Sequence, residues 1–353
     1  MQYARLGNSG LIVSRLAFGA MTFGSGQGVL GKIWTTGESA AQALVGRALD
    51  AGVNFFDVAD SYAEGESELI LGKALKPRRQ EVVISTKVGF RHSKALIRAG
   101  ASYGYILSAA EASLRRLHTD YIDLLSIHRY DPYTPFEESA RALEDLVRRG
   151  MVRYVGYSNF TGWQAAKFLG IQERMGYSRF TAAQMYYSLV GRDLEHEIVP
   201  FAIDAGIGIV VWSPLAGGFL SGRYTREDPT GGKGRLASFD FIPIDLERGF
   251  KLIDRMREMA ARHNATVAQV ALAWLLAKPC VISILLGASR MAQLEDNLGA
   301  ADLELASDQV AELDALTATV KPYPLWFQEK TADTVTREAL EPRIQQKTPA
   351  AAD

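Results

Sequence analysis

The chain has 353 residues, of which 48% are hydrophobic and 22% charged, and its formal net charge is −1. This balance is typical of a folded globular protein, and the lack of a basic block argues against nucleic acid or a membrane surface as a partner. No basic segment followed by a long apolar stretch opens the chain, and no run of eighteen uncharged apolar residues occurs, so we expect neither a signal peptide nor a membrane span. The single cysteine, Cys280, lies in an apolar run and is interpreted as a core residue, which fits a reducing, cytoplasmic location.

Short apolar runs alternate with longer segments of helical period along the chain. Runs that are apolar on both faces are typical of buried parallel strands. Their alternation with helices predicts right-handed crossovers and an α/β fold in which eight strands close into a (β/α)8 barrel. The predicted strands cover residues 16–18, 53–56, 82–86, 122–127, 154–157, 182–185, 207–212 and 281–286.

Helix boundaries are predicted from capping residues. Ser108 with Glu111 three residues later has the pattern of a capping box, and Pro135 followed by acidic residues marks another helix start. The predicted helices cover residues 38–51, 108–117, 135–149, 163–175, 194–205, 267–277 and 291–298.

Two segments break this pattern. Residues 214–245 form a long Gly- and Arg-rich loop after the seventh strand, and a loop of that length in a compact domain is usually functional or disordered. Residues 319–353 follow the last barrel element, so we predict a barrel domain over 1–318 and a C-terminal extension that lies over it. The end of the extension, Lys347 to Asp353, is expected to be frayed.

Polar residues stand at the C-terminal ends of three predicted strands. They are Asp57, Lys87 and His128, and Tyr62 follows Asp57 by five residues in the adjoining loop. In a (β/α)8 barrel these ends converge on the face that holds the active site. Taken singly, each has an ordinary structural explanation. Asp57 would be a strand-end cap and Tyr62 a loop aromatic, while Lys87 would be a surface lysine and His128 a hydrogen-bonded polar group. Together they favour a proton-transfer site, with Asp60 as the alternative to Asp57.

An ordered set of motifs resembles the aldo-keto reductases, in the branch that includes voltage-gated potassium-channel β-subunits. The resemblance extends nearly to residue 318, and it implies a TIM barrel whose floor is closed by an N-terminal β-hairpin. Each motif alone is weak, but their order is specific. The matching segments are Leu6 to Ser14, Asn54 to Tyr62, Ser85 to Lys87, Asp123 to His128, Gly156 to Asn159, Trp212 to Leu215 and Leu286 to Asn297.

The resemblance assigns a role to each of the four polar residues. A free tyrosine, with a pKa of about 10, is a poor acid at neutral pH, but a neighbouring ammonium lowers that value. Tyr62 would then be the general acid for carbonyl reduction and the base for alcohol oxidation, with Lys87 beside it. Asp57 would hold Lys87 charged and in place, and His128 would orient the carbonyl oxygen.

The resemblance also implies NADPH/NADP⁺ as the hydride carrier. No Gly-x-Gly-x-x-Gly follows the first strand, so a Rossmann domain is disfavoured. Arg290 near the start of a helix suits a phosphate and favours NADPH, yet the lysine of the commonest form is absent, which leaves strict selectivity open. Trp212 would stack on nicotinamide, with a core aromatic as the alternative. The implied contacts are Ser158, Asn159 and Gln184 for the carboxamide; Ser213, Leu215, Gly217, Arg223 and Arg235 for the pyrophosphate; and Gly287, Ser289, Arg290, Gln293 and Asn297 for the adenosine end.

The predicted function is the reversible, NADPH-dependent reduction of aldehydes and ketones, with a small carbonyl compound or alcohol as substrate. One alternative is a non-catalytic NADP-binding regulatory subunit like the channel β-subunits. A metal-dependent hydrolase using Asp57 and His128 is another, but the sequence offers no further ligands and no Cys/His metal pattern. The physiological substrate, the preferred direction and the oligomeric state stay open. Candidates for the wall of the substrate pocket are Phe23, Trp34, Phe90, Arg129, Tyr130, Tyr187 and Trp326.

Overall fold

Eight parallel strands close into a barrel in the computed structural model, which describes residues 1–27, 31–91, 94–229 and 241–345. Every neighbouring pair is parallel, and the order around the barrel is β10-β3-β4-β5-β6-β7-β8-β9. This confirms the predicted (β/α)8 fold. The barrel strands are β3 (Leu16–Gly19), β4 (Phe55–Asp57), β5 (Val83–Val88), β6 (Ile122–Ile127), β7 (Val152–Ser158), β8 (Phe180–Tyr186), β9 (Gly208–Trp212) and β10 (Val281–Gly287).

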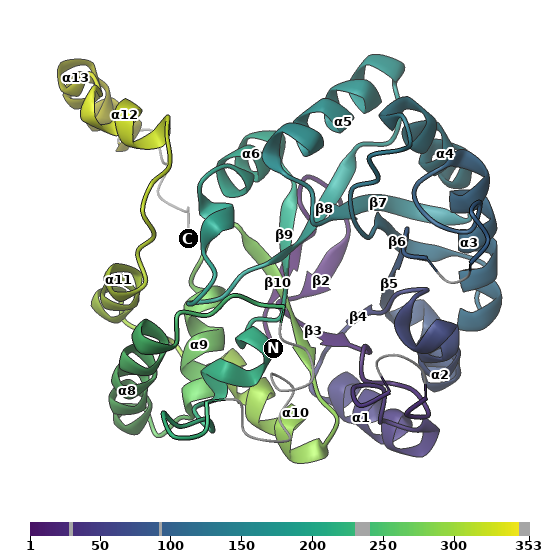
Figure 1. The fold of residues 1–353 in the computed structure, drawn as a ribbon, viewed down its shortest axis with the longest axis horizontal. Helices are drawn as coiled ribbons and strands as arrows, with labels where there is room; N and C mark the ends of the chain where they lie inside the picture. Colours follow the sequence, from purple (N-terminus) through teal and green to yellow (C-terminus); the bar gives the residue numbers. More distant parts are fainter. Residues whose placement is uncertain (28–30, 92–93, 230–240, 346–353) are drawn as a thin grey trace, which may run out of the picture. The chain divides into compact units, whose positions relative to one another are not determined.

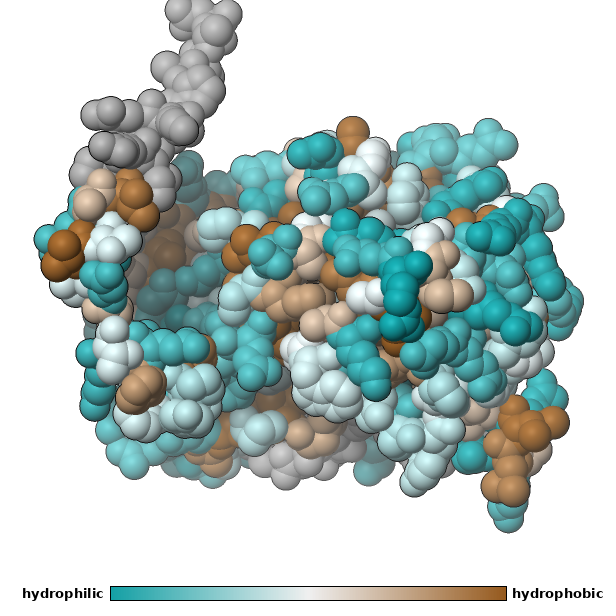
Figure 2. Space-filling view, turned by 90° about the horizontal axis from the view of Figure 1, so that it is seen from above, coloured by the Kyte–Doolittle hydropathy of each residue, from teal (hydrophilic) through white to brown (hydrophobic). Residues whose placement is uncertain are grey.

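Helices surround the barrel strands (Figure 1). Much of the face seen in Figure 2 is hydrophilic, with hydrophobic residues in small patches, as expected where amphipathic helices turn their apolar sides inward. The helices of the barrel unit are α1 (Glu38–Asp50), α2 (Glu66–Leu75), α3 (Tyr103–Leu117), α4 (Phe136–Arg148), α5 (Gly162–Met175), α6 (Ile198–Ala205), α8 (Leu246–Arg262), α9 (Val267–Leu276), α10 (Met291–Leu298) and α11 (Ser307–Leu316).

An antiparallel hairpin, β1 (Tyr3–Arg5) with β2 (Ile12–Ser14), closes the end of the barrel where the strands begin. Its Leu6 and Val13 side chains are fully buried and pack with one inward residue from seven of the eight barrel strands. Gly7 has a φ of +55°, and a Cβ there would lie 2.5 Å from the carbonyl oxygen of Thr181. Only glycine fits this close approach, so the hairpin is seated tightly in the barrel floor.

Two helix predictions need correction, and some helices were not predicted. The helix predicted to start at Ser108 begins at Tyr103, and the Ser108 hydroxyl donates to the carbonyl of Tyr105 and does not cap the helix. The helix predicted over 194–205 splits into a short 3-10 turn and α6, because Pro200 lacks an N–H and fits only in a first turn. The prediction also overlooked α2, α8 and α11 in the barrel unit, although α2 and α8 carry apolar residues at helical spacing.

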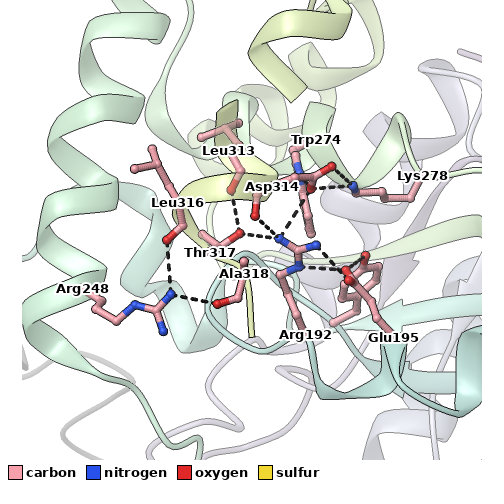
Figure 3. Close-up of polar contacts among 11 residues, drawn as sticks. Arg192, Glu195, Arg248, Trp274, Lys278, Leu313, Asp314, Leu316, Thr317 and Ala318 are labelled. Atoms are coloured by element: carbon pink, nitrogen blue, oxygen red, sulfur yellow. Dashed lines mark hydrogen bonds and ion pairs between the residues drawn. The ribbon is translucent and has the colours of Figure 1, made fainter. Parts of the chain in front are cut away.

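The chain divides into two compact units, Met1–Ala318 and Thr319–Asp353. Within the first, two arginines bind the C-terminal end of α11 (Figure 3). Arg192 donates to the Asp314 carbonyl and to the Thr317 hydroxyl, each at 2.8 Å, and Arg248 donates to the Ala318 carbonyl at 3.1 Å. The last carbonyls of a helix have no partner within it, and these arginines supply one.

The described part of the second unit, residues 319–345, contains the helices α12 (Leu325–Lys330) and α13 (Thr334–Gln345). Trp326 lies in α12 and is 42% exposed. The predicted frayed end, Lys347 to Asp353, lies outside the described residues.

Candidate active site

The alternation of side chains along the strands turns the predicted site residues toward the barrel interior. Phe55, Val83 and Leu124 belong to the buried cluster inside the barrel. Asp57 stands two residues after the first of these, and Lys87 and His128 stand four residues after the other two. An even spacing keeps a side chain on the same face of a strand, so all three point inward. Each lies at or just beyond the C-terminal end of its strand.

Asp57 and Lys87 form a buried ion pair. The Lys87 ammonium is fully buried and lies 2.6 Å from Oδ1 of Asp57, and it also donates to the carbonyl of Val58 at 2.7 Å. Burial by itself lowers the pKa of Lys87, but its interactions with Asp57 and Tyr62 outweigh that effect and the net pKa lies above the ordinary value. The pairing with Asp57 therefore favours the protonated form of Lys87.

Tyr62 and His128 lie beside this ammonium. The Lys87 Nζ atom is 5.1 Å from the centroid of the Tyr62 ring, and the Tyr62 and His128 rings meet edge-on with centroids 5.9 Å apart. Tyr62 begins a short 3-10 turn after β4. The Phe90 ring packs edge-on against the His128 ring, and their centroids are 4.5 Å apart. The structure thus brings all four predicted residues together.

Asp60 does not take the place of Asp57. Its carboxylate is buried and lies 3.5 Å from the hydroxyl of Tyr105, on α3. The ion pair with Lys87 is made by Asp57. These contacts favour Asp57 as the partner of Lys87, as its spacing to Tyr62 does.

The residues predicted to meet a carboxamide form one hydrogen-bonded chain. Asn159 donates from Nδ2 to the Ser158 hydroxyl at 2.9 Å and to the His128 carbonyl at 3.0 Å, and its Oδ1 accepts from the Trp212 indole at 3.1 Å. The Ser158 hydroxyl in turn donates to the backbone carbonyl of Gln184 at 2.7 Å. Asn159 has a φ of +57°, a conformation that asparagine adopts more readily than most residues.

Trp212 ends β9 on the inner face of the barrel and is only partly buried. Its ring contacts Tyr186, with centroids 5.1 Å apart, and Phe241, with centroids 6.0 Å apart and nearly parallel planes. Trp212 also packs against the buried cluster inside the barrel, so its stacking on nicotinamide and its alternative role as a core aromatic both stay predictions.

The segment after β9 folds into a tight turn, the 3-10 helix Ala216–Ser221. The Ser213 hydroxyl accepts a hydrogen bond from the Gly217 amide at 3.1 Å, and a Cβ on Gly218 would lie 2.9 Å from the Arg223 guanidinium. The turn thus places Arg223 against Gly218, with the partly buried Leu215 before the two glycines. Arg235, also predicted here, lies outside the described residues.

The residues predicted for the adenosine end gather after β10. Gly287 ends that strand, Arg290 immediately precedes α10, and Gln293 accepts hydrogen bonds from the amide and hydroxyl of Ser289 at 3.3 Å each. Asn297 lies on α10 and is buried.

The residues predicted to form the wall of the substrate pocket lie in different parts of the structure. Phe90 lies against His128, and the Arg129 guanidinium lies 5.1 Å from the centroid of the Phe90 ring. In contrast, Phe23 and Tyr187 are buried in the hydrophobic core and do not form a wall. Trp34 is buried beside Ala63, the residue after Tyr62, and Tyr130 packs into an aromatic cluster with Phe136.

Across the described parts of the chain, no group of three or more His, Cys, Asp or Glu side chains is arranged to hold a metal ion. In the same residues, no helix is long and apolar enough to cross a membrane.

Comparison with known proteins places this geometry in a family. Residues 15–318 match the Aldo/keto reductase family. A versiconal hemiacetal acetate reductase of Aspergillus parasiticus is 34% identical, over 89% of this chain and 96% of the relative. A probable voltage-gated potassium channel subunit beta of Arabidopsis thaliana is 34% identical over 86% and 92%, and a putative aryl-alcohol dehydrogenase of Schizosaccharomyces pombe 34% over 88% and 94%. The chain belongs to the Aldo/keto reductase family.

Proposed function

We propose that this oxidoreductase reduces aldehydes and ketones to alcohols, reversibly, with NADPH as the hydride donor and Tyr62 as the proton donor. The observation that carries the proposal is the buried Asp57–Lys87 pair beside the Tyr62 ring. A dry ammonium next to a phenol stabilises the phenolate and makes the phenol a usable acid near neutral pH.

The side chains present fit a nicotinamide. The carboxamide of that group needs donors and acceptors together, and the chain formed by Ser158, Asn159 and Gln184 offers both. Trp212 supplies a partly exposed ring at the same end of the barrel for stacking. When bound, the cofactor supplies the hydride that no side chain can give. Arg223 and Arg290 are proposed to meet its phosphates, with Arg290 giving the preference for NADPH.

The protein's own part of the mechanism is proton transfer and orientation. His128 hydrogen-bonds the carbonyl oxygen and directs it toward Tyr62, whose hydroxyl then donates its proton to that oxygen. Lys87 stabilises the phenolate left behind, and Asp57 keeps the ammonium charged and fixed. In alcohol oxidation the same groups act in reverse, with the Tyr62 phenolate as base.

Relatives named for a hemiacetal acetate and for aryl alcohols, together with Phe90 beside His128, favour bulky or aromatic carbonyl compounds as substrates. The test is NADPH oxidation with a panel of aromatic and aliphatic aldehydes and ketones, using the wild type and Tyr62→Phe. Loss of the hydroxyl is expected to lower kcat by about 10²-fold or more, with NADPH binding retained. Equal turnover by both proteins would refute the proposal.

The similarity to a channel β-subunit supports one alternative, an NADP-binding regulatory partner without a catalytic role. The same assay separates the two. A protein that binds NADPH tightly but turns over no carbonyl in the panel would favour the regulatory role.

A further inference from the structure

The backbone that follows Tyr62 is held in an unusual conformation. Ala63 has φ 46° and ψ 41°, Glu64 has φ 55° and ψ 30°, and Gly65 has φ 95°. Consecutive left-handed residues that carry a Cβ are unfavourable, and they persist only where the surroundings hold them. The position of the Tyr62 phenol therefore depends on whatever fixes this turn.

Arg116, on α3, fixes the turn from outside. A Cβ on Gly65 would lie 2.8 Å from both Cδ and Nε of Arg116, so the arginine side chain lies directly against the backbone of the turn. The same Nε donates to Oε2 of Glu68 at 2.6 Å. Glu68 lies in the first turn of α2, three residues after Gly65, and its ion pair with Arg116 encloses the turn.

Glu68 also reaches the strand that carries the ammonium. Thr86 donates from its hydroxyl to Oε1 of Glu68 at 2.5 Å, and Thr86 is the neighbour of Lys87 in β5. Because adjacent residues of a strand face opposite sides, Thr86 points out toward α2 while Lys87 points into the barrel. The Glu68 carboxylate thus connects Arg116, which lies against the turn after Tyr62, to β5, the strand that carries Lys87.

The carboxylate is costly to bury. Glu68 is fully buried, and burial raises its pKa, with nearby Asp60 adding to this, while Arg116 and the Thr86 hydroxyl act against it. An ion pair in such a position is weak evidence for stability, since an apolar pair of similar volume often serves as well. A role in holding two functional segments in register explains why charged groups stand there.

We infer that Glu68 and Arg116 are positioning residues that set the separation between the Tyr62 phenol and the Lys87 ammonium. This inference rests on the proposed function, in which Tyr62 is the acid. The attraction between an ammonium and a phenolate falls with distance, so a relaxed turn leaves the phenol a weaker acid.

The chain provides a matched control at the opposite end of the barrel. Arg79 pairs with Asp123 at 2.7 Å, and Asp123 also accepts from the backbone amide of Ile84 at 2.9 Å. This pair is also largely buried and attached to β5, but it lies where β5 and β6 begin, away from Tyr62.

The experiment compares Arg116→Met, Glu68→Gln and the control Arg79→Met with the wild type in thermal unfolding, NADPH affinity, KM and the pH profile of kcat. We expect Arg116→Met to lower kcat for carbonyl reduction about tenfold or more and to move the alkaline limb of the profile to higher pH, with NADPH affinity unchanged. Arg79→Met should lower stability without moving that limb. Glu68→Gln keeps the shape of the side chain but removes its charge. It therefore tests the Glu68–Arg116 ion pair even if the Arg116→Met variant folds poorly.

Equal losses of kcat in the Arg116 and Arg79 variants, or an unmoved alkaline limb in both Arg116→Met and Glu68→Gln, would overturn the inference. Failure of the proposed function is distinguishable, because it would appear as wild-type turnover that does not depend on the Tyr62 hydroxyl.

Discussion

Gln184 crosses the barrel interior to donate a hydrogen bond to Asp57, with its Nε2 atom 2.8 Å from Oδ2 of the carboxylate. The other oxygen of Asp57 is the one that pairs with Lys87. A residue proposed to contact the nicotinamide is therefore coupled directly to the ion pair proposed to tune Tyr62.

This coupling predicts different results for two substitutions. Gln184→Glu places a second carboxylate against Asp57, which raises one of the two acid pKa values and weakens the hold on Lys87. Gln184→Met removes only the hydrogen bond. We expect the Glu variant to lose much more kcat than the Met variant, in a steady-state assay with NADPH saturating. Similar losses in both would show that Gln184 acts only on the cofactor.

His128→Gln is expected to affect the carbonyl and not the cofactor. The glutamine amide can donate a hydrogen bond, but it lacks the ring that Phe90 and Tyr62 hold in place. We expect kcat/KM for carbonyl reduction to fall about 10²-fold, while the dissociation constant for NADPH, measured by fluorescence titration, stays within about twofold. A comparable loss of NADPH affinity would assign His128 to cofactor binding.

Arg290→Ala is expected to weaken NADPH binding about tenfold to a hundredfold, because a hydrogen bond to a charged group is worth roughly 1.5–3 kcal/mol. NADH affinity should change little, since that cofactor has no 2′-phosphate. Arg47→Ala is the control, because Arg47 also lies near α10, where it pairs with Glu295, and it is not proposed to contact the cofactor. Equal losses for both cofactors would mean that Arg290 contacts another part of the nucleotide.

The turn after β9 is expected to become more protected when NADPH binds. Hydrogen exchange at the amides of residues 217–229 should slow, while exchange in the floor hairpin stays the same. Arg223→Met should speed cofactor release more than it slows hydride transfer, because the guanidinium is remote from the reacting carbonyl. Arg226→Met is the control, since Arg226 is paired with Asp254 on α8. Unchanged exchange at saturating NADPH would contradict the proposal that this turn contacts the pyrophosphate.

Glu195→Gln is expected to lower stability in a pH-dependent way. Burial raises the pKa of Glu195, but hydrogen bonds from Arg192 and Tyr187 outweigh this and the net pKa lies below the ordinary value. Its contribution is thus present above the unfolded pKa of about 4.3 and is lost as the pH falls through the folded value. We expect Gln to cost about 1.5–3 kcal/mol in urea unfolding at pH 7 and progressively less toward acid. A pH-independent difference would show that lost packing, and not lost charge, is responsible.

The barrel, Asp57, Lys87 and His128 were predictable because strand patterns act locally, and Tyr62 because its spacing after Asp57 resembles that of the family. Phe55 and Asp57 share a face by spacing alone, and the fold then brings the strand ends together. The Glu68–Arg116 pair was not predictable in the same way, since it joins two helices 48 residues apart. The helix that carries Glu68 was itself overlooked, although Ile70, Leu71 and Leu75 have helical spacing. Ser108 misled the prediction, because a capping pattern inside a helix has the same letters as one at its start.

The floor hairpin has a consequence for the chemistry at the far end. Leu6 and Val13 close the barrel interior at the end where the strands begin, so they keep water from reaching the Lys87 ammonium from that end. The first fourteen residues therefore help to keep water away from the Asp57–Lys87 pair, although they lie at the other end of the barrel.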